Sequence, residues 1–157
     1  ATTNDVSGLD PYYKGAYVLH MLRYLIGDRS FFKVLNEFLY MKKQLPNNQV
    51  TTNDFITLVH QNTEKNIDWF FRTYLYELEY PVLIQKTKHG SNHTFIELYW
   101  ENENFSMPVE VFYNSNTGLK QRKLSLTNRP TMIAIPQYGK VKIDPEKRIL
   151  LRLIKRT

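Results

Sequence analysis

The feature that most constrains the fold is a change of hydrophobic period at Tyr80-Pro81, near the middle of the 157-residue chain. Before this point, apolar residues recur every three or four positions, which is the spacing of one helix face. After it, apolar and polar residues alternate, as in strands that bury one face. Pro81 disfavours helix at the residue before it, so the helical part should end there. The sequence therefore predicts an α+β chain in two parts, residues 1–79 and residues 80–157.

Four helices are predicted in the first part. The first begins near Tyr12 or Tyr13 and runs to Ile26, and Gly27 suits the position just after a helix. Asp28 is the predicted N-cap of a second helix, which ends at the basic pair 42–43.

The other two helices follow a loop at residues 44–50. Thr51 and Asp54 have the spacing of a capping box at the start of the third helix, with Asp in place of the usual Glu. The fourth helix is predicted in "NIDWFFRTYLYEL", residues 66–78. Together the four helices carry more aromatic residues than they can bury against one another, so part of this surface should be covered by something else.

About seven short strands are predicted in the second part. They lie at residues 82–88, 93–101, 105–113, 119–126, 131–135, 140–143 and 149–154. The turn sequences "HGSN" and "NSNTG" indicate hairpins between the first two strands and between the third and fourth. This pattern is typical of a small antiparallel β-sandwich.

Composition excludes several classes of protein. The net charge is +6, but the basic residues are scattered or flank an apolar run at the C-terminus, so we expect no nucleic-acid binding. No apolar run approaches the roughly 18 residues of a membrane span. The absence of cysteine excludes disulfides and thiolate metal ligands in this segment.

The histidines do not form a convincing metal motif. His89 and His93 have the spacing of the two histidines in His-Glu-x-x-His, but Gly90 stands at the glutamate position and the segment reads as a turn. His20 and His60 are predicted to be packing or surface residues. The sequence also lacks a nucleophile elbow and a glycine-rich phosphate loop.

The order of the motifs resembles a known family. Tyr12-Tyr13-Lys14-Gly15 is followed by "AYVLHMLRYLIGDRSFFKVLNEFL", then by the helix start at Thr51, by "IDWFFRTYL", and by strands such as "FSMPVEVFY" and "KVKIDPEKRILL". These segments closely resemble the zinc aminopeptidases of the aminopeptidase N family, the gluzincins, over residues 9–153. The resemblance implies that residues 1–79 are the C-terminal half of a thermolysin-like catalytic domain, and that the family's β-sandwich domain follows.

The resemblance also implies a role for one residue. Tyr12 matches the family's tyrosine of Tyr-x-Lys-Gly, whose hydroxyl is thought to donate a hydrogen bond to the oxyanion of the tetrahedral intermediate. A phenol with a pKa of about 10 stays protonated at neutral pH and can donate in this way. Tyr13 occupies the motif's variable position and is expected to have a structural role. Lys14 and Gly15 are expected to shape the helix start, with Gly15 allowing a close approach to neighbouring elements.

The family's zinc ligands, His-Glu-x-x-His and a later Glu, and its Gly-x-Met-x-Asn segment are not found in this sequence. In the family these motifs precede the tyrosine. We therefore expect a fragment of an enzyme that releases N-terminal residues from peptides, with Zn²⁺ held by the upstream half of the same chain and no catalytic zinc in this segment. Alone, the segment should be inactive and should self-associate through its helices. The alternative is a non-catalytic binding or scaffold module of the same fold.

Overall fold

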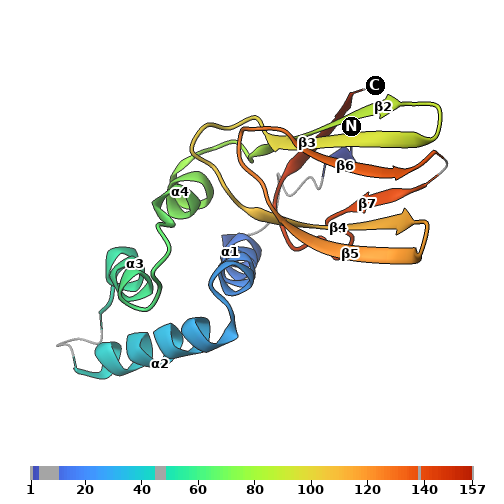
Figure 1. Cartoon of the computed structure of the whole chain (residues 1–157). Helices are drawn as coiled ribbons and strands as arrows, with labels where there is room; N and C mark the ends of the chain where they lie inside the picture. The colour runs from blue at the N-terminus through green and yellow to red at the C-terminus, as the bar shows by residue number, and fades with distance from the viewer. Residues whose placement is uncertain (1, 4–10, 45–48, 138, 157) are drawn as a thin grey trace.

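The computed structural model describes residues 2–3, 11–44, 49–137 and 139–156. The helices are α1 (Pro11–Ile26), α2 (Asp28–Gln44), α3 (Thr52–Gln61) and α4 (Asp68–Phe71), and α4 continues as the π-helical turn η2 (Arg72–Tyr76). Seven strands follow, and the predicted combination of a helical part with a β-sandwich is confirmed (Figure 1). The strands are β2 (Val82–His89), β3 (His93–Trp100), β4 (Pro108–Ser115), β5 (Gly118–Ser125), β6 (Thr131–Pro136), β7 (Val141–Ile143) and β8 (Arg152–Arg156).

A single glycine separates the first two helices. Gly27 has φ +85°, and its N–H donates to the Arg23 carbonyl at 2.8 Å, so it ends α1 as predicted. Asp28 differs from the prediction, because it is the first residue of α2 rather than the residue before it. Its carboxylate accepts two hydrogen bonds of 2.8 Å from the Arg23 guanidinium, which draws it away from the helix terminus.

The third helix begins with the predicted capping box. The Asp54 N–H donates to Thr51 Oγ1 at 3.2 Å, and the Thr51 N–H donates to the Asp54 carboxylate at 2.8 Å. Asp can replace the usual Glu because it is close enough to accept from both the backbone and the hydroxyl of Thr51. The fourth predicted helix is shorter and less regular than expected, since α4 has only four residues before the backbone widens into η2.

The strands form two sheets, with the orders β1-β8-β2-β3-β6 and β5-β4-β7. Both predicted hairpins, β2–β3 and β4–β5, are antiparallel pairs. Two features were not predicted. The strand β1 (Thr2–Thr3) comes from the start of the chain and pairs with β8, and β8 runs parallel to β2. The first part of the chain therefore contributes one short strand to the sheet built by the second part.

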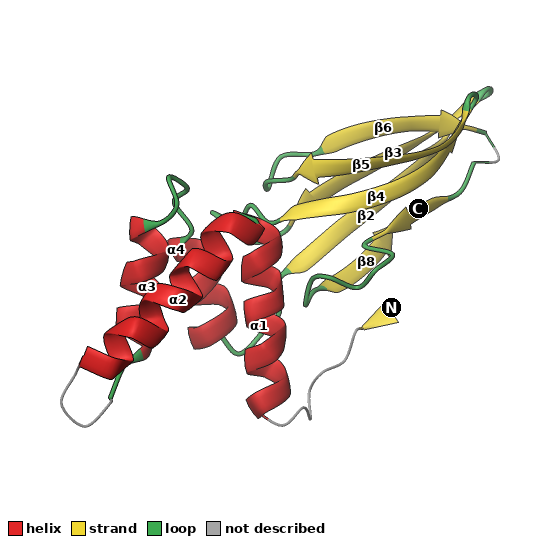
Figure 2. Cartoon of the chain, turned by 90° about the horizontal axis from the view of Figure 1, so that it is seen from below, coloured by secondary structure: helices red, strands yellow, loops and turns green. Residues whose placement is uncertain are grey.

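The helices gather at one end of the sandwich (Figure 2). Buried apolar side chains from α1 to η2 and from both sheets belong to one hydrophobic cluster. Aromatic rings join the two parts: Phe105 contacts Trp69, Tyr74 and Trp100 with ring-centroid distances of 4.8, 6.1 and 4.7 Å. In the described part of the chain, no helix is long and apolar enough to cross a membrane.

Candidate functional site

The two adjacent tyrosines occupy the first turn of α1. Tyr12 is 86% exposed and Tyr13 is 66% exposed. Consecutive residues of an α-helix point about 100° apart, so the two phenols face different directions. Tyr12 shares its side of the helix with Leu19 and Arg23, both of which are exposed.

The opposite sides of α1 are fixed by packing. Val18, Leu22 and Leu25 are buried in the hydrophobic cluster. Another face, formed by residues 17, 21 and 24, lies against the loop between β7 and β8. There the Tyr17 hydroxyl donates to the Lys147 carbonyl, and the Leu150 N–H contacts Met21 Sδ at 3.3 Å. The helix that carries Tyr12 is thus held on two sides, while the side of Tyr12 is exposed in this chain.

Gly15 does not have the predicted role within this chain. Apart from the neighbouring residues and backbone of α1 itself, no described atom lies within 4 Å of the point where a Cβ would stand, and the residue is exposed. The expected close approach of a neighbouring element at Gly15 is therefore absent from the described part of the structure. The resemblance to the family motif identified this glycine, but the contacts in this segment do not require it.

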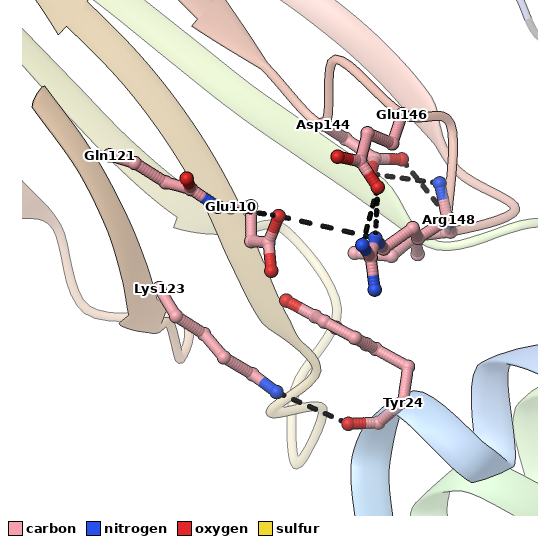
Figure 3. A network of polar contacts seen from close by, with 8 residues as sticks. Tyr24, Glu110, Gln121, Lys123, Asp144, Glu146 and Arg148 are labelled. Atoms are coloured by element: carbon pink, nitrogen blue, oxygen red, sulfur yellow. Dashed lines mark hydrogen bonds and ion pairs between the residues drawn. The ribbon is translucent and has the colours of Figure 1, made fainter. Parts of the chain in front are cut away.

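The C-terminal end of α1 meets a polar cluster on the sandwich (Figure 3). The Lys123 ammonium of β5 lies 3.7 Å from the centre of the Tyr24 ring and donates to the Tyr24 carbonyl at 3.1 Å. The Lys65 ammonium donates to the next carbonyl, that of Leu25, at 2.8 Å. Cations at these carbonyls complement the negative end of the helix dipole. Burial, followed by the nearby charge of Lys65, lowers the pKa of Lys123.

The Tyr24 hydroxyl is buried and has no hydrogen-bond partner among the described residues. Its pKa is raised, first by burial and then by the carboxylates of Glu110 and Asp144, so the phenol stays protonated. The Arg148 guanidinium lies 5.5 Å from the Tyr24 ring and 4.0 Å from the Glu110 carboxylate. This cluster can hold α1 on the sandwich, and it contains no arrangement of nucleophile and base.

Asp144 organises the loop between β7 and β8. It has φ +44°, and its two carboxylate oxygens accept from the N–H groups of Arg148 and Ile149 at 2.9 and 3.0 Å. Burial raises its pKa, against the opposing effect of these two hydrogen bonds. The same loop supplies the Leu150 carbonyl, which accepts from the buried Tyr74 hydroxyl at 3.1 Å.

Sequence reasoning missed the residues of this cluster. Tyr24 and Lys123 are 99 positions apart, and Asp144 is further still along the chain. One local signal was available, because Asp-Pro at residues 144–145 is a turn dipeptide, but it does not indicate which helix the turn contacts.

The histidines are dispersed, as the sequence predicted. His60 Nε2 lies 3.0 Å from the Asp68 carboxylate, and the His20 ring contacts Tyr17. His89 and His93 lie at the adjoining ends of β2 and β3, on a hairpin rather than on a helix, and His89 Nδ1 is 3.1 Å from Thr94 Oγ1. Among the described residues, no three His, Cys, Asp or Glu side chains are grouped so that they could hold a metal ion. This part of the chain therefore does not fit a zinc site.

The comparison with protein families concerns the helical part. Residues 2–74 match the Peptidase family M1 domain. The helical part is therefore similar to a segment of that domain. The match extends from β1 to Tyr74 in η2 and includes Tyr12 and Gly15 at the start of α1. The resemblance to aminopeptidase N-like enzymes that the sequence motifs indicated is confirmed.

A solved structure extends the similarity to the sandwich. The aminopeptidase A of Legionella pneumophila, in complex with aspartic acid, is similar to 92% of this chain, with a TM-score of 0.65 and 15% sequence identity. The match spans only 18% of the length of that aminopeptidase chain. At this identity the likeness concerns the fold. No curated protein sequence matches the chain.

Proposed function

We propose that this chain is part of a zinc-dependent aminopeptidase that releases N-terminal residues from peptides, and that it supplies the oxyanion-stabilising tyrosine, Tyr12. The observation that carries the proposal is the match of residues 2–74 to the Peptidase family M1 domain, with Tyr-x-Lys-Gly at the start of α1. The fold shared with an aminopeptidase over most of the chain supports it.

The position of Tyr12 suits the role of a hydrogen-bond donor. Its side chain is on an exposed side of a helix that is packed on two other sides, so a substrate bound by the rest of an intact enzyme could approach it. In peptide hydrolysis the carbonyl oxygen gains negative charge as the tetrahedral intermediate forms. A donor on a fixed helix, aimed at that oxygen, stabilises the transition state more than the ground state.

In this proposal the zinc ion is bound outside the described residues, which do not fit a zinc site. In the parent enzyme the metal would activate the attacking water, as the resemblance to the family implies. The chain described here contributes Tyr12, the helices that hold it and the sandwich that supports α1. Its partners are then the peptide substrate and the zinc-binding half of the same polypeptide.

The experiment is the substitution Tyr12→Phe in the intact parent, with aminoacyl-anilide hydrolysis and zinc content measured together. We expect kcat to fall by a factor of about 10²–10³, because one oxyanion donor is removed. Zinc content should stay unchanged, because Tyr12 is not a ligand. The matched control is Tyr13→Phe, which should retain nearly full activity. An unaltered rate in the Tyr12→Phe enzyme would refute the proposed role.

The alternative is a non-catalytic binding or scaffold module, since no described His, Cys, Asp or Glu side chains are grouped so that they could hold a metal ion. The two functions differ in the sequence that precedes Tyr12 in the parent gene. An intact His-Glu-x-x-His there supports the enzyme, and its loss supports the module. On the enzyme proposal, the 157-residue chain alone hydrolyses no aminoacyl anilide when zinc is added. Turnover that a chelator abolishes would contradict the assignment of zinc to the upstream half.

A further inference from the structure

A pocket of about 410 Å³ lies at the open side of the sandwich, between β7 of one sheet and β8 of the other. β7 and β8 belong to different sheets, so the space between the two layers opens here. Its volume falls within the range of sites that bind small organic molecules. The pocket is on the sandwich and is separate from the exposed side of α1 that carries Tyr12.

Two polar side chains face the interior of the sandwich at this pocket. Leu83 is fully buried and pairs with Leu153, and two residues further along the same strands Gln85 pairs with Lys155. Because side chains alternate along a strand, Gln85 and Lys155 project from the same face as the two leucines. Gln85 is only 7% exposed. An amide and an ammonium thus stand on the sheet face that also carries Leu83 and Leu153.

These polar groups have few hydrogen-bond or ion-pair partners within the described chain. The Gln85 amide makes one hydrogen bond there, a long one of 3.3 Å from Nε2 to Thr87 Oγ1. Lys155 forms no ion pair with any described residue, nor do Lys142 and Lys147, which also line the pocket. A side-chain amide can make several hydrogen bonds, so Gln85 can still bind a ligand that enters the pocket.

The charge of the pocket is positive. Three lysines are among the residues that line it, and the one acidic residue among them is Asp144. Both oxygens of Asp144 accept hydrogen bonds from backbone N–H groups of the following loop, at 2.9 and 3.0 Å, so the carboxylate is already hydrogen-bonded within that loop. The formal balance, three positive groups minus one negative group, favours an anionic ligand.

The remaining walls are apolar. Val141 and Ile143 of β7 face Leu151 and Leu153 across the pocket. We propose that this pocket binds an amphiphilic anion, a straight-chain carboxylate whose head group lies between Lys155 and Gln85 and whose alkyl chain lies against β7. The head group would receive a charge-assisted hydrogen bond from the ammonium and a second one from the amide. The alkyl chain would cover apolar surface that the open side of the sandwich leaves accessible to water.

The test is a titration of the 157-residue chain with sodium octanoate, followed by amide chemical shifts in two-dimensional NMR. Shifts should concentrate at Gln85, Val141 and Lys155. Octanol, which lacks the charge, and butanoate, which lacks most of the chain, should each bind at least about tenfold more weakly. Equal affinity for octanol, or shifts confined to the helices, would overturn the proposal.

Two variants separate the head-group and tail contributions. Lys155→Gln should weaken octanoate binding about tenfold, since a charge-assisted hydrogen bond is lost. Val141→Phe should fill the pocket and abolish binding. The matched control, Lys120→Gln on the exposed strand β5, should bind as the unaltered chain does. Because Lys155 is exposed, its substitution should leave the fold intact, and octanoate binding that is unchanged in Lys155→Gln would refute the site.

Discussion

Gly15 shows how a residue can be required by a motif without being required by the contacts of this segment. It lies inside α1, is exposed, and has no described atom of another element within 4 Å of a Cβ position. Alanine has a higher helix propensity than glycine by about 0.8–1.0 kcal/mol. We therefore expect Gly15→Ala to raise the free energy of unfolding of this chain by about 1 kcal/mol, measured by urea denaturation.

The neighbouring position supplies the matched control. Ala16 is also exposed in α1, so Ala16→Gly should lower the free energy of unfolding by a similar amount. If Gly15 packs against the upstream half of the proposed parent enzyme, Gly15→Ala in that enzyme should reduce activity although it stabilises the segment. A Gly15→Ala chain that is less stable than the original would show that this position is packed already within the segment.

Residues whose roles depend on local sequence were the predictable ones. The helix end at Gly27 and the capping pair of α3 are both encoded within a few positions. The Lys123–Tyr24 contact and the Asp144 loop depend on how distant segments meet, and no local period encodes that meeting. The pairing of Gln85 with Lys155 follows only from the parallel register of β2 and β8, which the sequence did not reveal.

Among the elements, α3 offers the sharpest test of a local stabilising interaction, because its N-terminus is capped by one reciprocal pair of hydrogen bonds, between Thr51 and Asp54. Thr51→Ala removes the hydroxyl that accepts from the Asp54 N–H, and N-cap substitutions of this kind cost about 1 kcal/mol. Urea denaturation should therefore show a lower free energy of unfolding. Thr57→Ala is the matched control, since that hydroxyl bonds to the Asn53 carbonyl inside the helix and satisfies no free N–H. Equal losses in both variants would argue against the capping box.

The same pair makes the stability of α3 depend on pH. Hydrogen bonds from the Thr51 side chain and then from its backbone hold the pKa of Asp54 below its ordinary value of 3.8. A lowered carboxyl pKa contributes stability that is present above the unfolded pKa and is lost as the pH falls through the folded pKa. We expect thermal unfolding below about pH 4 to lose this contribution. Thr51→Ala should show a smaller loss over that range, and an identical pH profile would contradict the assignment.

An element could be predicted where its hydrophobic pattern is long and where it pairs with the next element in the sequence. Both hairpins connect consecutive strands through turn residues, so their pairing was evident. The two-residue strand β1 has no period to recognise, and the parallel β2–β8 pair joins strands separated by most of the sandwich. The fourth helix was predicted too long because apolar spacing does not distinguish a regular helix from one that widens into η2.

At the scale of the whole molecule, the helical part packs on the sandwich with one set of faces and exposes another. Single exposed apolar residues are ordinary on a protein surface. In the helical part, however, exposed apolar side chains recur on several helices. The exposed large apolar residues described in the helical part are Tyr12, Tyr13, Leu19, Phe32, Leu39, Tyr40, Leu75, Tyr76 and Leu78. A surface of this kind is expected to pack against another part of the parent protein, and in its absence against a second copy.

We therefore expect the isolated chain to self-associate through its helices, with an average mass that rises with concentration in sedimentation equilibrium. Leu39→Gln on α2 should weaken this association, because it places a polar group on a surface that would be buried. Leu119→Gln on β5 is the matched control, since Leu119 is 71% exposed and Leu39 is 57% exposed. A strictly monomeric chain at all concentrations, or equal effects of the two substitutions, would show that the helical face is not the contact.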